Sequence, residues 1–154
     1  MKTLQVKQIS SEEAKARAFA IRMRVFVREQ GVPPEIELDA DDRRARHFLA
    51  TINGAAVGTA RLVMRRGAAK IGRMAVLKSF RRKGVGAGLL KHAVTAARRL
   101  GANKIYLHAQ VPVIGFYERL GFVCVGAVFE EASIPHRKMV WKAAAPNRRR
   151  KLQR

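Results

Sequence analysis

A short glycine-rich and cationic stretch at residues 81–88 has the residue types of a site for a pyrophosphate group. It reads Arg81-Arg82-Lys83-Gly84-Val85-Gly86-Ala87-Gly88 and lies between a β-branched run and a run with helical periodicity. Glycine lets the backbone approach a bulky anion and turn consecutive N–H groups toward it, and the helix that starts there adds the positive end of its dipole. A glycine-rich loop that only caps a surface helix is the alternative. The three cations and the preceding apolar strand favour the anion site.

The elements that position this stretch follow from the changing periodicity of the chain. Alternating apolar residues predict an antiparallel meander with a tight hairpin at Asn53-Gly54, and a helical period then begins at Gly84. Ser10 or Ser11, followed by Glu12 and Glu13, reads as the cap of an alanine-rich helix. We expect strands at 4–9, 47–52, 55–64, 69–76, 104–109, 122–128 and 137–142, and helices from that cap to about Glu29, at 84–100 and at 113–120.

The spacing Arg-x-x-Gly-x-Gly at residues 81–86 resembles the acetyl-CoA signature of the GNAT family of N-acetyltransferases. A second family element, aromatic-Tyr-x-x-Leu-Gly-Phe, has its counterpart at residues 116–122. A closer resemblance, to the bacterial ElaA/YjcF-like subgroup, covers roughly residues 4–142. It rests on residues 24–30, the acidic run that ends at Asp42, Ala109-Gln110 and Ile134-Pro135-His136. This chain has Ser133 where that subgroup usually has glycine, so the path of the turn before Ile134 is open.

The resemblance implies an α/β (α+β) acyl-CoA N-acyltransferase fold. In that fold a mixed, mostly antiparallel sheet is flanked by helices, and two central parallel strands splay apart to admit the pantetheine arm of acetyl-CoA. Here those strands would be 69–76 and 104–109. Backbone groups left unpaired where the strands part can bond the arm, and an N–H there can stabilise a developing oxyanion. The cofactor contacts that we expect are Met74, Ala75, Val76, Arg81, Arg82, Lys83, Gly84, Val85, Gly86 and Ala87.

Tyr117 is the candidate catalytic acid. A phenol is protonated at neutral pH and can donate to the departing CoA thiolate, whose thiol has a pKa near 8.5. The alternative is a core tyrosine that packs beside Phe116, because helix-spaced aromatic residues are usually packing. The family element that contains Tyr117 favours the catalytic role.

Acidic residues cluster between residues 29 and 42 in a chain that is otherwise strongly basic. One interpretation is that this acidic run holds a cationic amine acceptor; the other is that it balances neighbouring arginines such as Arg22 and Arg43. The general base is open, with Glu37, Glu131 and His136 as candidates and His47 and His108 also able to titrate. The acceptor-side residues that we expect are Glu29, Gln30, Glu37, Asp39, Glu131 and His136.

Composition predicts one compact domain at residues 1–142, followed by a basic, disordered tail at 143–154. No apolar run has the length of a membrane span, the N-terminus lacks the core of a signal peptide, and Cys124 lies in an apolar alternation. We therefore expect a cytoplasmic monomer or homodimer without a metal and with no membrane association. The formal charge of +21 predicts non-specific attraction to nucleic acid or other polyanions.

Two functions from different classes remain. The first is an acetyl-CoA-dependent N-acetyltransferase that moves an acetyl group to a primary amine, of a small molecule or a peptide, by direct attack on the thioester. The second is a basic RNA- or ribosome-associated module that keeps the fold and CoA binding without turnover. The anion loop and Tyr117 favour the enzyme, while the net charge and the tail favour the module only weakly.

Overall fold

The computed structural model describes residues 3–142, and these divide into two compact units at the Leu107–His108 bond. The predicted tail at 143–154 lies outside the described residues, and the single domain at 1–142 stays a prediction. Within the described part of the chain, no helix has the length and apolar character needed to cross a membrane. Each unit is described below by itself.

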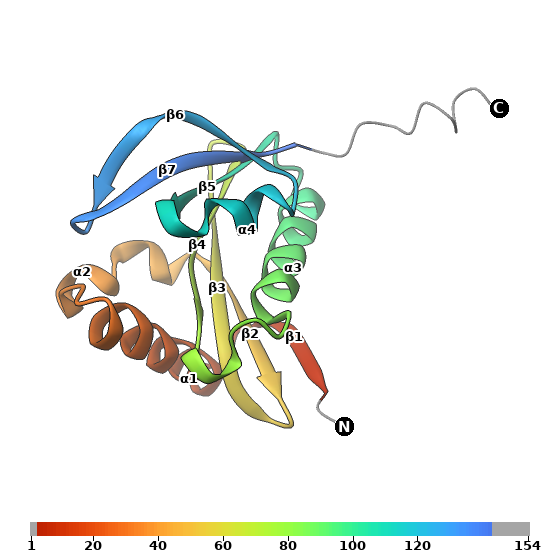
Figure 1. Ribbon diagram of the computed structural model, residues 1–154. Helices are drawn as coiled ribbons and strands as arrows, with labels where there is room; N and C mark the ends of the chain where they lie inside the picture. Colours follow the sequence, from red (N-terminus) through yellow and green to blue (C-terminus); the bar gives the residue numbers. More distant parts are fainter. Residues whose placement is uncertain (1–2, 143–154) are drawn as a thin grey trace. The chain divides into compact units, whose positions relative to one another are not determined.

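Five strands in the order β1-β2-β3-β4-β5 build the sheet of the first unit (Figure 1). They are β1 (Leu4–Ile9), β2 (Arg46–Ile52), β3 (Ala55–Arg65), β4 (Ala68–Val76) and β5 (Lys104–Gln110), whose last three residues belong to the second unit. The first four strands pair antiparallel, and β2, β3 and β4 form the predicted meander. Asn53 and Gly54 have φ of 50° and 81°, which is the conformation of the tight hairpin expected from their residue types.

The helices of the first unit begin where their capping residues predict. Ser11 caps α1 (Glu12–Arg22) by accepting a hydrogen bond from the amide of Ala14 at 3.1 Å. The predicted continuation to Glu29 is wrong in detail, because residues 23–29 form a π-helix, η1 (Met23–Glu29). Two short elements that the sequence reading missed follow it, and a third precedes the long helix. The remaining elements are α2 (Pro34–Glu37), η2 (Ala40–Arg43), η3 (Lys78–Phe80) and α3 (Val85–Arg99).

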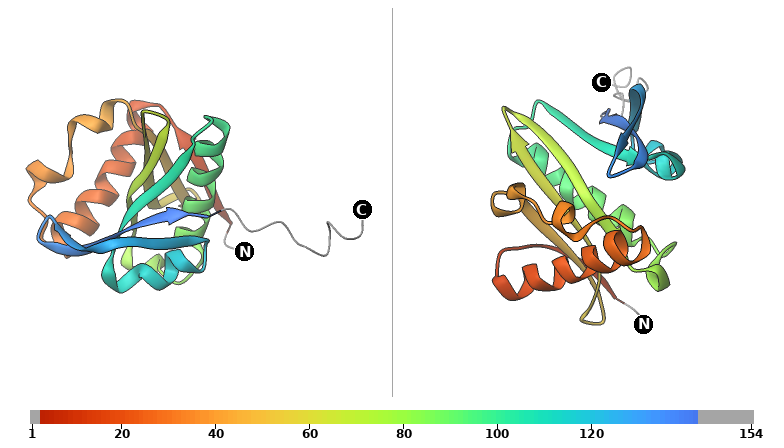
Figure 2. Two further views of the ribbon diagram at one scale, coloured as in Figure 1. Left: turned by 90° about the horizontal axis from the view of Figure 1, so that it is seen from above. Right: turned by 90° about the vertical axis from the view of Figure 1, so that its left-hand side faces the viewer.

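The strands of the first unit lie between α1 and α3 (Figure 2). Adjacent residues of a strand point to opposite faces, so Leu49 packs in the cluster with α1 whereas Phe48 faces α3. On the α3 face, Gly58 allows close packing, since a Cβ there would lie 2.9 Å from the side chain of Val85 and 3.0 Å from that of Leu89. The core of this unit therefore consists of two apolar layers, one on each face of the sheet.

Strand β4 loses its regular pairing shortly before its end. Its parallel pairing with β5 covers only Ala68–Lys70 opposite Lys104–Tyr106. On the other side, Thr59 pairs with Ala75 and Arg61 with Gly72, so two residues of β4 stand opposite one residue of β3. This β-bulge at residues 73–74, with a φ of 48° at Arg73, bends the strand where the sequence predicted that backbone groups would be released.

The second unit is a hairpin preceded by a helical turn. Its elements are η4 (Val111–Val113), α4 (Ile114–Glu118), β6 (Phe122–Glu131) and β7 (Ile134–Trp141), and the strand order continues from β5 through β7 to β6. The hairpin turn consists of Ala132 and Ser133, with φ of 50° and 62°. The turn that was open at Ser133 is thus a two-residue turn, formed by residues that favour positive φ less than glycine does.

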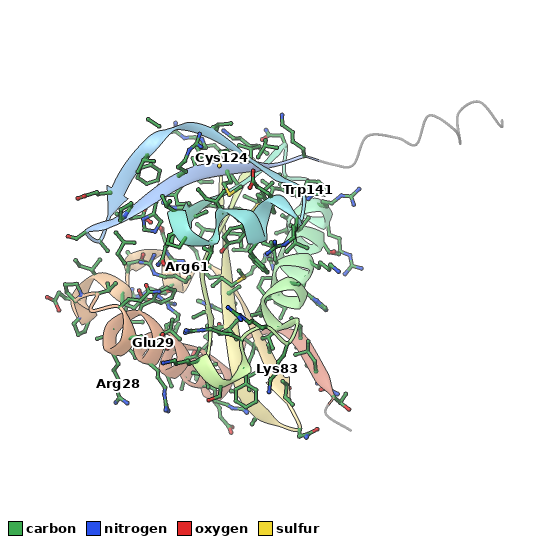
Figure 3. All side chains as sticks on the ribbon, viewed as in Figure 1. Arg28, Glu29, Arg61, Lys83, Cys124 and Trp141 are labelled. Carbon is green, nitrogen blue, oxygen red and sulfur yellow. The ribbon has the colours of Figure 1, made fainter. Side chains whose placement is uncertain are left out.

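A network of buried ion pairs lies under the loop of residues 36–42 in the first unit. Arg22 is only 1% exposed, and its Nε donates to Glu37 Oε1 at 2.9 Å while Nη1 donates to Asp42 Oδ1 at 2.7 Å. Arg61 donates through Nη1 to Asp39 Oδ1 at 2.6 Å and to Asp42 Oδ1 at 2.9 Å (Figure 3). Two guanidinium groups therefore share the Asp42 carboxylate.

Arg73, the first residue of the bulge, connects β4 to this network. Its Nε lies 3.3 Å from Glu37 Oε2, and its Nη2 donates to Asp39 Oδ2 at 3.2 Å. The same side chain donates to the backbone carbonyl oxygens of Ile36 and Glu37. Because these bonds require Arg73 to face the loop of residues 36–42, the network supports the left-handed backbone on which the bend of β4 depends.

The network predicts that acid destabilises the fold through Asp42. Burial by itself would raise the pKa of this carboxyl group, but the bonds and charges of Arg22 and Arg61 together with the Asp39 amide lower it from 3.8 to about 2. The stabilisation is therefore complete above pH 4 and is lost as the pH falls toward 2, a loss of about 2 kcal/mol. Urea unfolding at several pH values should show a flatter acid limb for Asp42→Asn than for wild type.

Asp41→Asn is the control for this prediction, because Asp41 lies next to Asp42 and pairs only with the exposed Arg44 and Arg65. It should keep the acid limb of the wild type. Parallel wild-type and Asp42→Asn curves between pH 4 and 2 would contradict the assignment of the acid-sensitive free energy to Asp42.

Candidate active site

The predicted anion loop lies between η3 and α3 and presents the N-terminus of a long helix. Gly84 is the N-cap residue with φ of 80°, no side chain caps this helix, and no acidic residue lies in its first turn. The amide of Gly88 already bonds the carbonyl of Gly84 at 3.0 Å, so the amides of residues 85–87 lack intrahelical partners. The N-terminus of α3 therefore presents backbone N–H groups that have no partner within the helix. The cations that precede it, at residues 81–83, are exposed.

The residues of the loop divide into backbone and side-chain contributors. Val85 is 1% exposed, so its side chain belongs to the core and only its amide can face a ligand. A Cβ at Gly84 would meet no atom within 4 Å, which leaves the space above this residue open. Lys83 lies with its Nζ 5.6 Å from the ring centroid of Phe80, and Arg82 is exposed with φ of 62° (Figure 3). Open space, oriented amides and cations fit a pyrophosphate group.

Arg81, whose predicted contact with the cofactor stays a prediction, forms two hydrogen bonds within the first unit. Its Nε donates to the carbonyl oxygen of Val76 at 2.9 Å, and its Nη2 donates to Glu29 Oε1 at 2.8 Å (Figure 3). Arg81 thus joins the anion loop to the end of β4 and to the end of η1. The Val76 carbonyl is already used by this bond, whereas Met74, in the bulge, has no register partner on β3 or β5 among the described residues.

The predicted acceptor residues of the first unit lie among arginines. Glu29 pairs with Arg81, and Glu37 and Asp39 pair with Arg22, Arg61 and Arg73. Gln30 is exposed and ends η1. In the structure, Glu37 and Asp39 therefore neutralise arginines. We do not propose either carboxylate as a ligand for an ammonium group.

Tyr117 lies in α4, half-buried between two aromatic rings of the second unit. Its ring centroid is 5.1 Å from that of Phe116 and 6.1 Å from that of Phe122, both in edge-on geometry. Burial raises the pKa of Tyr117 to about 12, although part of the residue remains exposed. No described residue forms a hydrogen bond with its hydroxyl group. The phenol is thus a protonated donor held in place by packing.

Glu131 and His136 lie close together in the second unit. His108, which was not among the acceptor-side residues that we expected, lies beside them. Glu131 Oε1 is 3.0 Å from Nδ1 of His108, and its Oε2 is 3.7 Å from Nε2 of His136. The ring of Phe129 packs against both imidazoles, at 4.9 Å and 6.0 Å between centroids. The Glu131 carboxylate accepts from Nδ1–H of His108, which leaves Nε2 as the basic nitrogen of the neutral ring.

His47 is removed from the candidate bases by its surroundings. It is 1% exposed, its Nε2 donates to the carbonyl of Asp42 at 2.9 Å, and its ring packs edge-on against Phe19. Burial lowers the pKa of this imidazole, so the neutral ring is favoured as a structural group.

The structural arginines Arg61 and Arg73 and the bulge were missed in the sequence. A signal existed, because both arginines lie inside strands that are largely apolar, and a buried arginine in such a strand requires a carboxylate partner. His108 as the partner of Glu131 had no local signal, since 23 residues separate the two.

Comparisons with known proteins agree with this geometry. The family model described as acetyltransferase (GNAT) domain matches residues 5–143. The chain is 37% identical to the N-acetyltransferase YjcF of Bacillus subtilis over 131 residues, which cover 84% of this chain and 94% of that protein. It is 34% identical to ElaA of Escherichia coli over 122 residues, which cover 75% and 79% of the two chains.

Solved structures show the same fold. The crystal structure of Escherichia coli ElaA superposes with a TM-score of 0.79 at 29% identity, covering 92% of this chain and 100% of that chain. An acyl-CoA N-acyltransferase from Pseudomonas aeruginosa superposes with a TM-score of 0.78 at 30% identity and the same coverage. These findings confirm the predicted fold and the resemblance to the ElaA/YjcF-like subgroup. The chain belongs to the GNAT family of N-acetyltransferases.

Proposed function

We propose that this enzyme transfers the acetyl group of acetyl-CoA to a primary amine of a small molecule or peptide. The neutral amine attacks the thioester carbon and the C–S bond breaks, which gives the acetamide and the CoA thiolate. The amine loses one proton to a base, and the released thiolate takes one proton from solvent. The observation that carries the proposal is the uncapped N-terminus of α3, behind a bulged strand whose Met74 backbone lacks a ladder partner. Both features fit the binding of a long, amide-containing phosphorylated cofactor.

In this proposal the amides of residues 85–87 and the Lys83 ammonium group hold the pyrophosphate of acetyl-CoA. Backbone groups of Met74 and Ala75 face the amide-rich arm in this proposal, because Met74 lies in the bulge and Ala75, which pairs with Thr59 of β3, has no partner on β5. Arg81 is a positioning residue, since its guanidinium group ties the loop to the Val76 carbonyl and Glu29. Main-chain donors therefore supply much of the recognition.

Tyr117 is the proposed donor to the departing sulfur. A phenol with a pKa of about 12 stays protonated at neutral pH. Because the thiol of CoA is a stronger acid than this phenol, a hydrogen bond to the thiolate is favoured over complete proton transfer in water. The donor thus stabilises the charge that develops on sulfur and remains a tyrosine afterwards.

His108 is the proposed acceptor of the amine proton, with Glu131 as its positioning residue. The carboxylate fixes the ring tautomer and stabilises the imidazolium ion that forms on protonation. His136 stands on the other side of the same carboxylate and donates through Nδ1 to the Ile134 carbonyl at 2.6 Å. His108, Glu131 and His136 thus form one cluster in the second unit, in which the Glu131 carboxylate lies next to both imidazole rings.

The primary test of the function is a screen for thiol release. Purified enzyme with acetyl-CoA should release CoA thiol in the presence of at least one class of primary amine, and the acetylated product should be detected by mass. An intact protein that binds acetyl-CoA and acetylates none of the amines would favour the alternative without turnover. None of the relatives described above favours an RNA- or ribosome-associated module.

We expect Gly86→Val to weaken acetyl-CoA binding by roughly tenfold or more, about 1.4 kcal/mol. A branched side chain in the first turn of α3 would intrude on the anion that the amides of residues 85–87 hold. Isothermal calorimetry measures the affinity. Gly88→Ala is the control, because a Cβ there makes only ordinary contacts, 3.4 Å to Val6 and 3.6 Å to Leu4. An unchanged affinity in folded Gly86→Val would defeat the assignment.

Tyr117→Phe should lower kcat by roughly tenfold to several-hundredfold with little change in acetyl-CoA affinity. The substitution removes only the hydroxyl group and keeps both ring contacts, so the fold should be preserved. Steady-state kinetics and a thermal melt separate the two roles. A packing role predicts a lower Tm with normal turnover, and that result would remove Tyr117 from the chemistry.

Glu131→Gln should lower kcat in steady-state kinetics with little change in acetyl-CoA affinity or Tm. Without the carboxylate, Nδ1–H of His108 loses the acceptor that fixes the tautomer and orientation of the ring. Glu130→Gln is the matched control, because it removes the same charge from the next residue of β6, which points to the opposite face. Equal kcat values for the two variants would show that Glu131 does not act through His108.

A further inference from the structure

A groove on the first unit lies outside every residue that the proposed reaction uses. It encloses about 550 Å³ between α3 and the strands β1 and β2. From the strands it is lined by Val6, Lys7, Gln8, Arg46 and Phe48, and from the helix by Lys91, His92, Thr95, Ala96, Arg99 and Leu100. The volume is in the range of small-molecule sites. No residue of the anion loop at 81–88 belongs to this lining.

The two walls of the groove follow from regular structure. On α3, the lining residues recur at positions 92, 95, 96 and 99, which lie on one face of a helix. On the strands, Gln8 stands directly opposite Phe48 in the antiparallel register, and Lys7 and Arg46 lie beside this pair. The helix packs on both strands, so the walls are held by the core of the unit rather than by loops.

Positive charge in the groove is uncompensated. Arg46, Lys91 and Arg99 are exposed, and none of them forms an ion pair with a residue of the described chain. Lys7 borders the groove through its strand, but it stands opposite Leu49, so its side chain points to the α1 face. No carboxylate lines the groove, and residues 43–117 contain no Asp or Glu at all. The four acidic residues at 37–42 each form an ion pair with an arginine that lies outside the groove.

The interior of the groove adds an apolar floor and directed polar groups. Phe48 is 2% exposed, so it forms part of the floor and offers no open ring face. His92 donates from Nδ1 to the Gly88 carbonyl at 3.0 Å, which fixes the orientation of the ring in the wall of the groove. Three cations above a low-dielectric floor concentrate a positive field, which raises the local concentration of anions.

We propose that this groove binds a small ligand that carries several phosphate groups, at a site separate from the acetyl-CoA loop. Arginine offers paired donors to phosphate oxygens and lysine offers a point charge, and the groove presents Arg46 and Arg99 together with Lys91. Stacking of nucleic-acid bases is not favoured, because the one aromatic carbocycle in the lining is buried. The bounded volume likewise fits a compact ligand rather than a long strand.

Inorganic tripolyphosphate is the probe, titrated by calorimetry into full-length enzyme already saturated with CoA at about 0.15 M salt. Saturation with CoA occupies the loop at 81–88, so remaining binding reports on a second site. We expect one further site per chain. The double variant Lys91→Gln/Arg99→Gln should bind tripolyphosphate roughly tenfold or more weakly and should keep wild-type affinity for CoA.

Arg43→Gln/Arg66→Gln is the matched control, since it removes two exposed arginines of the same unit that lie outside the lining. It should retain wild-type affinity for tripolyphosphate. Equal weakening in the two double variants would overturn the site, because it would show attraction to overall charge. Binding of a short single-stranded RNA without binding of tripolyphosphate would overturn the small-ligand assignment in favour of nucleic acid. The absence of any second binding event would also overturn it.

Discussion

The buried pairing of Arg22 with Glu37 and Asp42 is the interaction on which the first unit depends. Arg22 and Glu37 are 1% and 3% exposed, so removing either side chain would leave buried charges that solvent cannot reach and that lack one of their partners. Arg61 and Arg73 extend the same pairing to β3 and β4. The loop at 36–42 cannot move without uncovering three guanidinium groups. The network thereby holds the bulge in β4 in a single conformation, next to the backbone that we assign to the cofactor arm.

A more exposed ion pair, between Arg81 and Glu29, connects the anion loop to η1. Arg81 and Glu29 are 39% and 35% exposed, and an ion pair at such exposure contributes little to stability. Its geometric effect is larger, because the same guanidinium group also bonds the Val76 carbonyl. The buried ion-pair network therefore holds the bulge, whereas the anion loop after it is held by an exposed ion pair that water can replace. A loop that must admit and release a large anion requires this difference in strength.

Much of the fold could be predicted from local signals, and the failures share one cause. Strand alternation, the Asn53-Gly54 turn, the Ser11 cap and the Gly84 helix start are all encoded within a few residues, and the structure confirms each of them. The π-helix η1, the bulge at Arg73 and the His108–Glu131 contact depend on residues far apart in sequence. Backbone strain and long-range pairing are decided by tertiary packing, which periodicity does not report.

Acidic and basic residues are separated along the chain. This separation explains why the acidic run between residues 29 and 42 had two possible interpretations. At residues 37–42 the carboxylates neutralise buried arginines, and this use removes them from the surface on which most of the cations lie. The same segregation leaves residues 43–117 without any acid, and both the anion loop and the groove beside α3 come largely from that stretch. Since uncompensated cations self-repel, their concentration around α3 opposes folding unless anions bind there. The positive surface and the buried network are therefore two consequences of one distribution of carboxylates along the chain.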